Sequence, residues 1–430
     1  MLSNHGAWGA QGAWGARGAL PILIVLVISA GTLHAQPPRY TLGDLEQRAL
    51  AAHPALAVAQ AESQAIKQAA EQAGALPNPV VGYQGEDIRT GAPTYGGQHG
   101  VFMEQVIPLG GKLHVRRDAL LQQGRASEAA IDVARQRVRA GVRTAYARAL
   151  VAVERVRVAE SLEAALDESV QTSRQLYNIG MADRPDLLEV EAESARAALG
   201  ARTARADREA AWTALAVAVG DPALPRGELE GAIADLPQLA DRATAWQTTE
   251  QENPQLVEAA RLADAADASI AVERGVTSPD LVLRGGAMYD RARETGDAQA
   301  NGWQGRAEVG MSLPLWNRNH AGIAASQAQS EAARSRVRAV SLDLQRRFDE
   351  TYASYSTSAD AVRTYRDEIL PRADLAYKLS LERYRAMNAS YVQVLIARRT
   401  LVDATASYVQ ALGQAWREAV ALQTGLAGEP

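Results

Sequence analysis

The sequence predicts a mainly α-helical protein with a small β part, in which one helix–β-hairpin–long helical hairpin unit occurs twice. Long stretches without proline keep the apolar spacing of helices. Short alternating segments, bounded by Pro and Gly, have the pattern of strands. Motifs in the first half of the 430-residue chain recur in the same order in the second half, about 200 residues later. Aromatic residues make up only 5% of the chain, so small residues must fill the contacts between the long helices.

The composition excludes several classes of function. A net charge of −5 provides no basic surface for a nucleic acid. The absence of cysteine excludes a disulfide framework, a thiolate metal site, a cysteine nucleophile and a lipidated N-terminal cysteine. The six histidines lack metal-ligand spacing, and the sequence contains no nucleophile elbow and no phosphate-binding loop. We therefore expect no enzyme, no cofactor and no metal site.

The N-terminal segment has the pattern of a secretory signal peptide over residues 1–35. Its apolar run, 20–28, is shorter than the ~20 residues that span a bilayer. Arg17 precedes the run and small residues follow it up to Ala35, where we expect cleavage. A single membrane anchor is the alternative. No later segment is apolar enough for a transmembrane helix, so the exported chain would enter a membrane only by strands.

Two repeats, 36–240 and 241–430, organise the rest of the chain. Pro54 matches Pro254 at an offset of 200, and Tyr177 matches Tyr384 at an offset of 207. Because the offset drifts by only seven residues, the matches indicate a duplication.

The elements of each repeat follow in a fixed order. In the first repeat we expect a helix over 42–75 with Thr41 as its N-cap, strands over 79–88 and 100–107, a long helix over 113–178 and a return helix over 185–219. In the second we expect a helix over 246–274, strands over 279–289 and 303–313, a long helix over 319–386 and a return helix over 391–423. The first long helix would be roughly 100 Å long. Pro371 should kink or interrupt the second.

The segment 303–313 alternates between apolar and polar side chains. Trp303, Val309, Met311 and Leu313 lie on one face of this strand, which would be a lipid face. Such alternation over ~10 residues is typical of outer-membrane strands, although an ordinary half-buried strand shows it too. Four strands cannot close around a useful pore, and lipid does not tolerate open edges. If the strands enter a membrane, the chain must contribute them to an oligomer.

The ordered set of elements and motifs resembles the outer-membrane efflux protein (TolC-like) family. The motifs include 76–79 (LPNP) before the first strand and 104–112 (EQVIPLGGK) at the strand exit. The second of these, together with 369–373 (ILPRA) and Tyr377, resembles the heavy-metal resistance branch of CzcC- and CusC-like proteins. The resemblance covers about residues 40 to 425.

The resemblance implies a homotrimer, with a trimeric α-helical tunnel across the periplasm and a 12-stranded transmembrane β-barrel surrounded by outer-membrane lipid. It also implies two partners, a periplasmic adaptor (membrane fusion) protein and an inner-membrane pump of the resistance-nodulation-division (RND) type. The expected function is a passive outer-membrane conduit that exports heavy-metal cations from the periplasm or cytoplasm.

By the same resemblance, the adaptor docks at the turns of the helical hairpins, where the tunnel also closes. The corresponding residues are Gly180, Asp183, Arg184, Asp186, Met387, Asn388 and Ser390. Family tunnels often narrow at an acidic ring on the second turn, but 387–390 is uncharged here. An acidic ring would have to come from elsewhere, such as Asp183 or Asp186. A solvated turn with Asp near a helix N-terminus is the other interpretation of these residues.

Other functions remain open at this stage. Within the family, a multidrug efflux or type I secretion conduit fits the same pattern, because a conduit need not encode its cargo. A periplasmic coiled-coil adaptor or scaffold would explain the long helices but not the duplicated strand pairs. A secreted enzyme on a helical frame would need a catalytic constellation that the sequence does not contain.

Overall fold

The computed structural model describes residues 38–86, 88, 97–180, 183–290, 302–386 and 388–427. The chain divides into two units, Met1–Pro37 and Pro38–Pro430, and all described residues belong to the second. The predicted signal peptide therefore lies outside the described residues.

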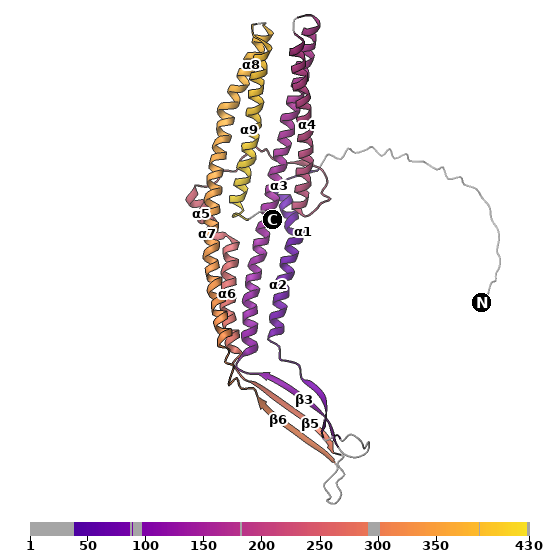
Figure 1. The fold of residues 1–430 in the computed structure, drawn as a ribbon, viewed down its shortest axis with the longest axis vertical. Helices are drawn as coiled ribbons and strands as arrows, with labels where there is room; N and C mark the ends of the chain where they lie inside the picture. The colour runs from indigo at the N-terminus through magenta and orange to yellow at the C-terminus, as the bar shows by residue number, and fades with distance from the viewer. Residues whose placement is uncertain are drawn as a thin grey trace, which may run out of the picture. The chain divides into compact units, whose positions relative to one another are not determined.

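The second unit contains long helices and one four-stranded sheet (Figure 1). The helices and strands of the first repeat are β1 (Arg39–Tyr40), α1 (Leu42–Ala52), α2 (Pro54–Ala73), β2 (Val80–Glu86), β3 (Gln98–Pro108), α3 (Lys112–Asn178), α4 (Arg184–Val219) and β4 (Glu228–Leu229). Those of the second are α5 (Arg242–Glu252), α6 (Pro254–Gly275), β5 (Asp280–Asp290), β6 (Gly302–Met311), α7 (His320–Thr364), the π-helical turn η1 (Tyr365–Ile369), α8 (Leu370–Arg385) and α9 (Tyr391–Gln423). The order of two helices, two strands, a long helix and a return helix thus occurs twice.

The prediction for the first helix of each repeat is wrong in one respect, because the structure has two helices in place of one. The helix expected over 42–75 is α1 and α2, and the one expected over 246–274 is α5 and α6. The breaks fall at His53 and Asn253, each followed by a proline that disfavours α-helical dihedrals at the residue before it. Both residues are extended, with ψ of 126° and 114°, and each then caps the next helix with its side chain. The N-cap at Thr41 is confirmed as a capping box with Asp44.

The long helices match their predicted ranges closely. α3 has 67 residues and is therefore roughly 100 Å long. The interruption predicted at Pro371 is confirmed as η1, where the N–H of Leu370 donates to the carbonyl of Tyr365, five residues earlier. Because proline has no N–H to donate, the helix can widen at this point. Among the described helices, none carries a stretch apolar enough to cross a bilayer.

Two buried clusters hold the helices together. The larger one joins α1, α3, α4 and α9 around Val142, Leu215 and Leu412. The smaller one, around Leu344 and Phe348, joins α7 to the end of α9. Elsewhere along α3 the buried side chains are mostly alanine and valine, as the low aromatic content predicts.

The sheet combines the hairpins of both repeats in the order β2-β3-β5-β6, all antiparallel. The central pair, β3 and β5, joins the repeats, with Gln98 opposite Asp290 and Pro108 opposite Asp280. β2 and β6 are the edge strands. Within the second unit, the sheet lies at one end of the helices, and the α3–α4 and α8–α9 turns lie at the other (Figure 1).

Candidate functional site

One face of the sheet is apolar and exposed across all four strands. Trp303 and Val309 on β6 are 74% and 73% exposed, and the register places them opposite Tyr289 and Leu283 of β5. The exposed large apolar side chains on this apolar face are Val81, Tyr83, Val101, Met103, Leu283, Tyr289, Trp303, Val309 and Met311. The predicted residue Leu313 is also exposed, but it lies after β6, which ends at Met311. The same face also carries His99 and Gln105 of β3, opposite Tyr289 and Leu283. A largely apolar surface of this kind requires an apolar partner.

The opposite, polar face carries charged side chains in cross-strand rows. Glu104, Arg284 and Glu308 stand opposite one another on β3, β5 and β6, so their charges alternate across the strands. The guanidinium of Arg284 lies 3.9 Å from the centre of the Phe102 ring and donates a hydrogen bond of 3.1 Å to Gln84 on β2. This face is therefore suited to contact with water.

An ion pair on the polar face shows how the sheet is curved. Arg306 on β6 pairs with Glu86 on β2, although these are the two edge strands and two strands lie between them. Side chains of this length meet only if the sheet curls toward them. The polar face is therefore the concave one, and the apolar face is convex.

Aromatic and large apolar side chains gather at both ends of β6. At the loop end, Tyr289 and Trp303 make an edge contact with ring centres 5.6 Å apart. Beyond the other end, Leu315 and Trp316 are 60% and 93% exposed. The eleven residues from Trp303 to Leu313 make ten steps and would extend ~33 Å as one continuous strand, or about 25 Å vertically at a tilt near 40°. This height equals that of the apolar band of an outer-membrane strand.

The turn between α3 and α4 contains four of the predicted tip residues, or lies directly beside them. Gly180 has φ of +75°, which allows the chain to turn after α3. Asp183 is the N-cap of α4 by its backbone and makes no side-chain cap hydrogen bond. Asp183 and Arg184 are exposed, whereas Asp186 is half-buried. Asp186 lies near Tyr384 of α8, where burial raises the pKa of the tyrosine hydroxyl and the Asp186 carboxylate raises it further.

The turn between α8 and α9 contains Asn388 and Ser390, which are both exposed. The backbone N–H of Asn388 donates to the carbonyl of Arg383 at 2.9 Å, which closes the turn. Ser390 precedes α9 as its N-cap without a side-chain hydrogen bond. Met387 lies outside the described residues. The structure thus places the six described tip residues at the turns between α3 and α4 and between α8 and α9; the proximity of Tyr384 to Asp186 was not predicted.

The junction between β3 and α3 contains a buried lysine. Lys112, at the end of the 104–112 motif, is only 9% exposed. Its Nζ lies 2.7 Å from Oδ1 of Asp280, at the start of β5. The ion pair joins the first residue of α3 to the second repeat, and nothing in the local sequence signals this partner, 168 residues away.

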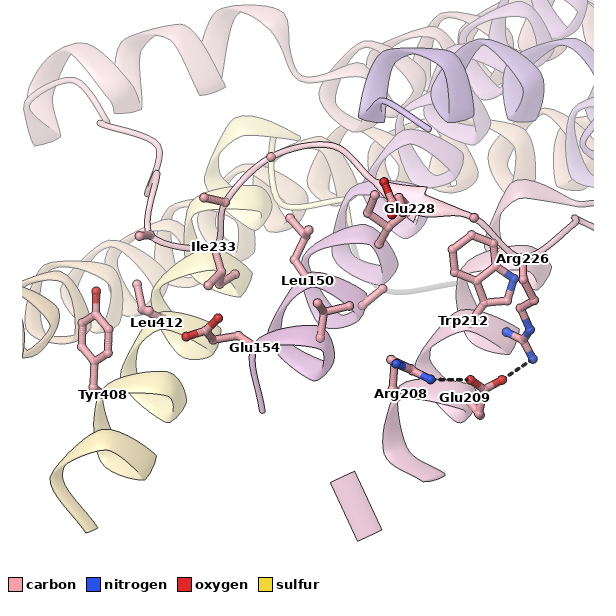
Figure 2. Close-up of a pocket in the computed structure, with 17 residues that line it drawn as sticks. Leu150, Glu154, Arg208, Glu209, Trp212, Arg226, Glu228, Ile233, Tyr408 and Leu412 are labelled. Carbon is pink, nitrogen blue, oxygen red and sulfur yellow. Dashed lines mark hydrogen bonds and ion pairs between the residues drawn. The ribbon is translucent and has the colours of Figure 1, made fainter. Parts of the chain in front are cut away.

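A groove of about 680 Å³ lies between α3, α4, α9 and the segment 226–234 (Figure 2). Leu150, Ile233 and Leu412 provide apolar walls. Glu209 accepts from Arg208 at 3.4 Å and pairs with Arg226 at 2.9 Å. These groups do not form an arrangement of nucleophile and base. Over the described part of the chain, no group of three or more His, Asp or Glu could hold a metal ion.

Comparison with known proteins agrees with this architecture. The sequence matches the family "Outer membrane efflux protein" over residues 45–221 and 245–428. It is 28% identical over 352 residues to the cobalt-zinc-cadmium resistance protein CzcC of Cupriavidus metallidurans, covering 82% of this chain and 81% of that protein. It is 27% identical over 330 residues to the nickel-cobalt-cadmium resistance protein NccC of Alcaligenes xylosoxydans xylosoxydans, covering 74% and 71%.

The fold is also similar to that of a solved channel. The structure of the outer-membrane channel OprN aligns with a TM-score of 0.73 at 20% identity, over 90% of this chain and 91% of that one. The mainly helical fold with its small sheet, predicted from the repeat pattern, is thus found in a solved outer-membrane channel. Because the family match covers most of both repeats, this chain belongs to the outer membrane efflux protein family.

Proposed function

We propose that this chain is the outer-membrane channel component of a tripartite efflux system and a passive conduit for the export of heavy-metal cations. The observation that carries the proposal is the curled sheet, whose convex face is apolar and whose concave face is charged. A sheet of this kind fits a barrel wall with lipid outside and water inside. The family membership supports the same assignment.

The open edges of the sheet favour an oligomer, and the resemblance to the family implies a homotrimer. Among the described strands, β2 and β6 each have no neighbour on one side. In lipid these backbone groups would be unsatisfied, so β6 of one copy would pair with β2 of the next. Three copies would contribute four strands each to a 12-stranded barrel, and their helices would form a tunnel across the periplasm. Residues 1–35 would be removed during export, near Ala35.

The helical tips would meet the partners of the channel. A periplasmic adaptor protein would dock there and connect the channel to an inner-membrane RND pump. The residues proposed for docking and gating are Gly180, Asp183, Arg184, Asp186, Met387, Asn388 and Ser390. The sequence contains no phosphate-binding loop, so the pump would supply the energy. Cargo could move from the periplasm or the cytoplasm.

The proposed cargo rests on the relatives. The names of CzcC and NccC associate those proteins with resistance to cobalt, zinc, cadmium and nickel. A passive conduit needs no strong cation site, since its cargo must leave as readily as it enters. The charged concave face would keep the barrel interior wet for such ions.

Membrane fractionation and growth assays test the proposal. The expressed chain should be found in the outer membrane, and its detergent-extracted mass should correspond to three copies. A strain that lacks the chain should become sensitive to divalent heavy metals and regain resistance on complementation. Sensitivity to drugs alone would favour multidrug efflux, and loss of a secreted protein would favour type I secretion. A soluble periplasmic monomer would instead indicate an adaptor or scaffold.

A further inference from the structure

A buried arginine connects the two helical hairpins near their tips. Arg398 of α9 is only 7% exposed, and its Nη1 donates to Oγ of Ser169 on α3 at 2.9 Å. Its guanidinium also lies 5.8 Å from the ring centre of Tyr377 on α8. The arginine thus contacts one hairpin through Ser169 and its own hairpin through Tyr377.

The charge of Arg398 has no direct ion-pair partner among the described residues, although Glu189, Glu193 and Asp403 line the larger groove beside it. Within the described ranges, no carboxylate lies within the 4.0 Å of an ion pair to this guanidinium. Its hydrogen-bond acceptor is a neutral hydroxyl, which itself donates to the carbonyl of Ala165 at 2.9 Å. Removing a cation from water is unfavourable, and a single hydrogen bond offsets only part of that cost.

The packing around Arg398 is incomplete. Two grooves, of about 370 and 220 Å³, lie beside the side chain, and Leu162, Val402 and Arg398 line both of them. Nearer the sheet, α3 and α9 pack closely, with Val151 and Leu412 buried in the larger cluster. Ser169 lies 18 residues beyond Val151, or ~27 Å along α3. The contact therefore lies beyond the larger cluster, with Leu166 and Val394 as buried apolar neighbours about one turn away on α3 and α9.

We infer that Arg398 and Ser169 form a metastable clasp between the two hairpins. Ser169 holds the hairpins together by accepting the hydrogen bond, and the burial of the Arg398 charge opposes their closure. Separation would expose the guanidinium to water and recover its hydration. If the chain is the proposed channel, the cost of burying the Arg398 charge lowers the free energy that a docked partner must supply to open the tunnel.

The clasp predicts opposite effects for its two residues. Ser169→Ala leaves Arg398 buried without an acceptor and should raise the ratio of separated to closed hairpins about tenfold. Arg398→Met keeps much of the side-chain volume but removes the charge, and should lower the ratio about tenfold. Arg399→Met is the matched control, because Arg399 is the exposed neighbour and lines the same larger groove. Its ratio should stay within about twofold of the wild type.

Spin-label distances between the hairpins measure this ratio directly. The chain has no cysteine, so Leu188→Cys on α4 and Ile396→Cys on α9, both at exposed positions, give specific labels. Labelled full-length chains, diluted with unlabelled ones in detergent, should show more of the long distance with Ser169→Ala and less with Arg398→Met. If both variants lengthen the distance, Arg398 is a simple latch and the clasp is refuted. Unchanged distances in both, with unchanged melting temperatures, also refute it.

Single-channel recording separates the clasp from the proposed function. In planar bilayers, the open probability should rise with Ser169→Ala and fall with Arg398→Met. If the distances change as expected but no protein conducts, the channel function fails and the clasp stands. If the wild type conducts and Arg398→Met matches it in both distance and open probability, the clasp fails and the channel function stands.

Discussion

A single positive charge on the apolar face tests whether this face contacts lipid. Val309 is 73% exposed and lies six residues after Trp303 on β6. Six residues extend ~20 Å, or about 15 Å vertically at a tilt near 40°. In an apolar band about 25 Å high, Val309 would lie within a few ångströms of the bilayer midplane.

Val309→Arg should therefore prevent stable insertion. A lipid-facing arginine near the midplane costs about 3 kcal/mol per chain, or about 9 kcal/mol for three chains. Glu308→Arg is the control, because it introduces the same residue at the adjacent position on the polar face. Its expected cost is below about 1 kcal/mol, from the loss of the favourable charge opposite Arg284.

Folding into lipid vesicles measures this difference. The fraction of inserted protein is read after urea dilution, and circular dichroism checks that the helices still form. We expect Val309→Arg to stay helical but outside the vesicles, while Glu308→Arg inserts like the wild type. Equal insertion of the two variants would refute the assignment of lipid to the apolar face.

Three further predictions follow from other contacts. Lys112→Ala should lower the free energy of unfolding by about 2 kcal/mol, because it leaves Asp280 without its buried partner. Lys67→Ala, at an exposed ion pair, should lower it by less than about 0.5 kcal/mol in chemical unfolding, and equal losses would contradict the role of burial. Gly220→Ala should destabilise the fold by about 2 kcal/mol, because φ is +82° and the new Cβ would lie 3.3 Å from the Cα of His53. Gly200→Ala, in the open middle of α4, should instead stabilise the fold by about 0.5 kcal/mol, and thermal unfolding that shows the same sign for both variants would contradict this reasoning. Replacing both helical tips by short glycine linkers should abolish metal resistance but keep the outer-membrane trimer, and resistance that survives would exclude docking at the tips.

Local patterns predicted most of the elements. Proline positions and strand alternation placed all four strands of the sheet to within a few residues. The breaks at His53 and Asn253 were missed, although the proline after each residue was a readable signal. Leu313 was assigned to the strand because it continues the alternation of apolar and polar residues. The strand β6 nevertheless ends before Pro314, which has no N–H to donate to a neighbouring strand.

Long-range contacts were not predictable from such patterns. Arg306 and Glu86 are 220 residues apart, and Arg398 and Ser169 are 229 apart. Periodicity assigns each of these side chains to a face of a helix or strand, but only the packed fold decides which faces meet. The tip residues were predicted by resemblance, and those within the described ranges lie at the two turns between the long helices. Arg398, between the hairpins, belongs to no motif that could have signalled its contact.

The central strand pair has a consequence for the order of assembly. Residues paired between β3 and β5 are separated by 172 to 192 positions in the chain. During synthesis and export the first hairpin therefore emerges long before its neighbour exists. A lone two-stranded hairpin is marginal in water, and this one exposes Val81, Tyr83 and Met103. Until α3 to α6 have been synthesised, the first hairpin lacks the neighbour that completes its sheet, and the time needed for that stretch sets how long its apolar side chains stay without a partner.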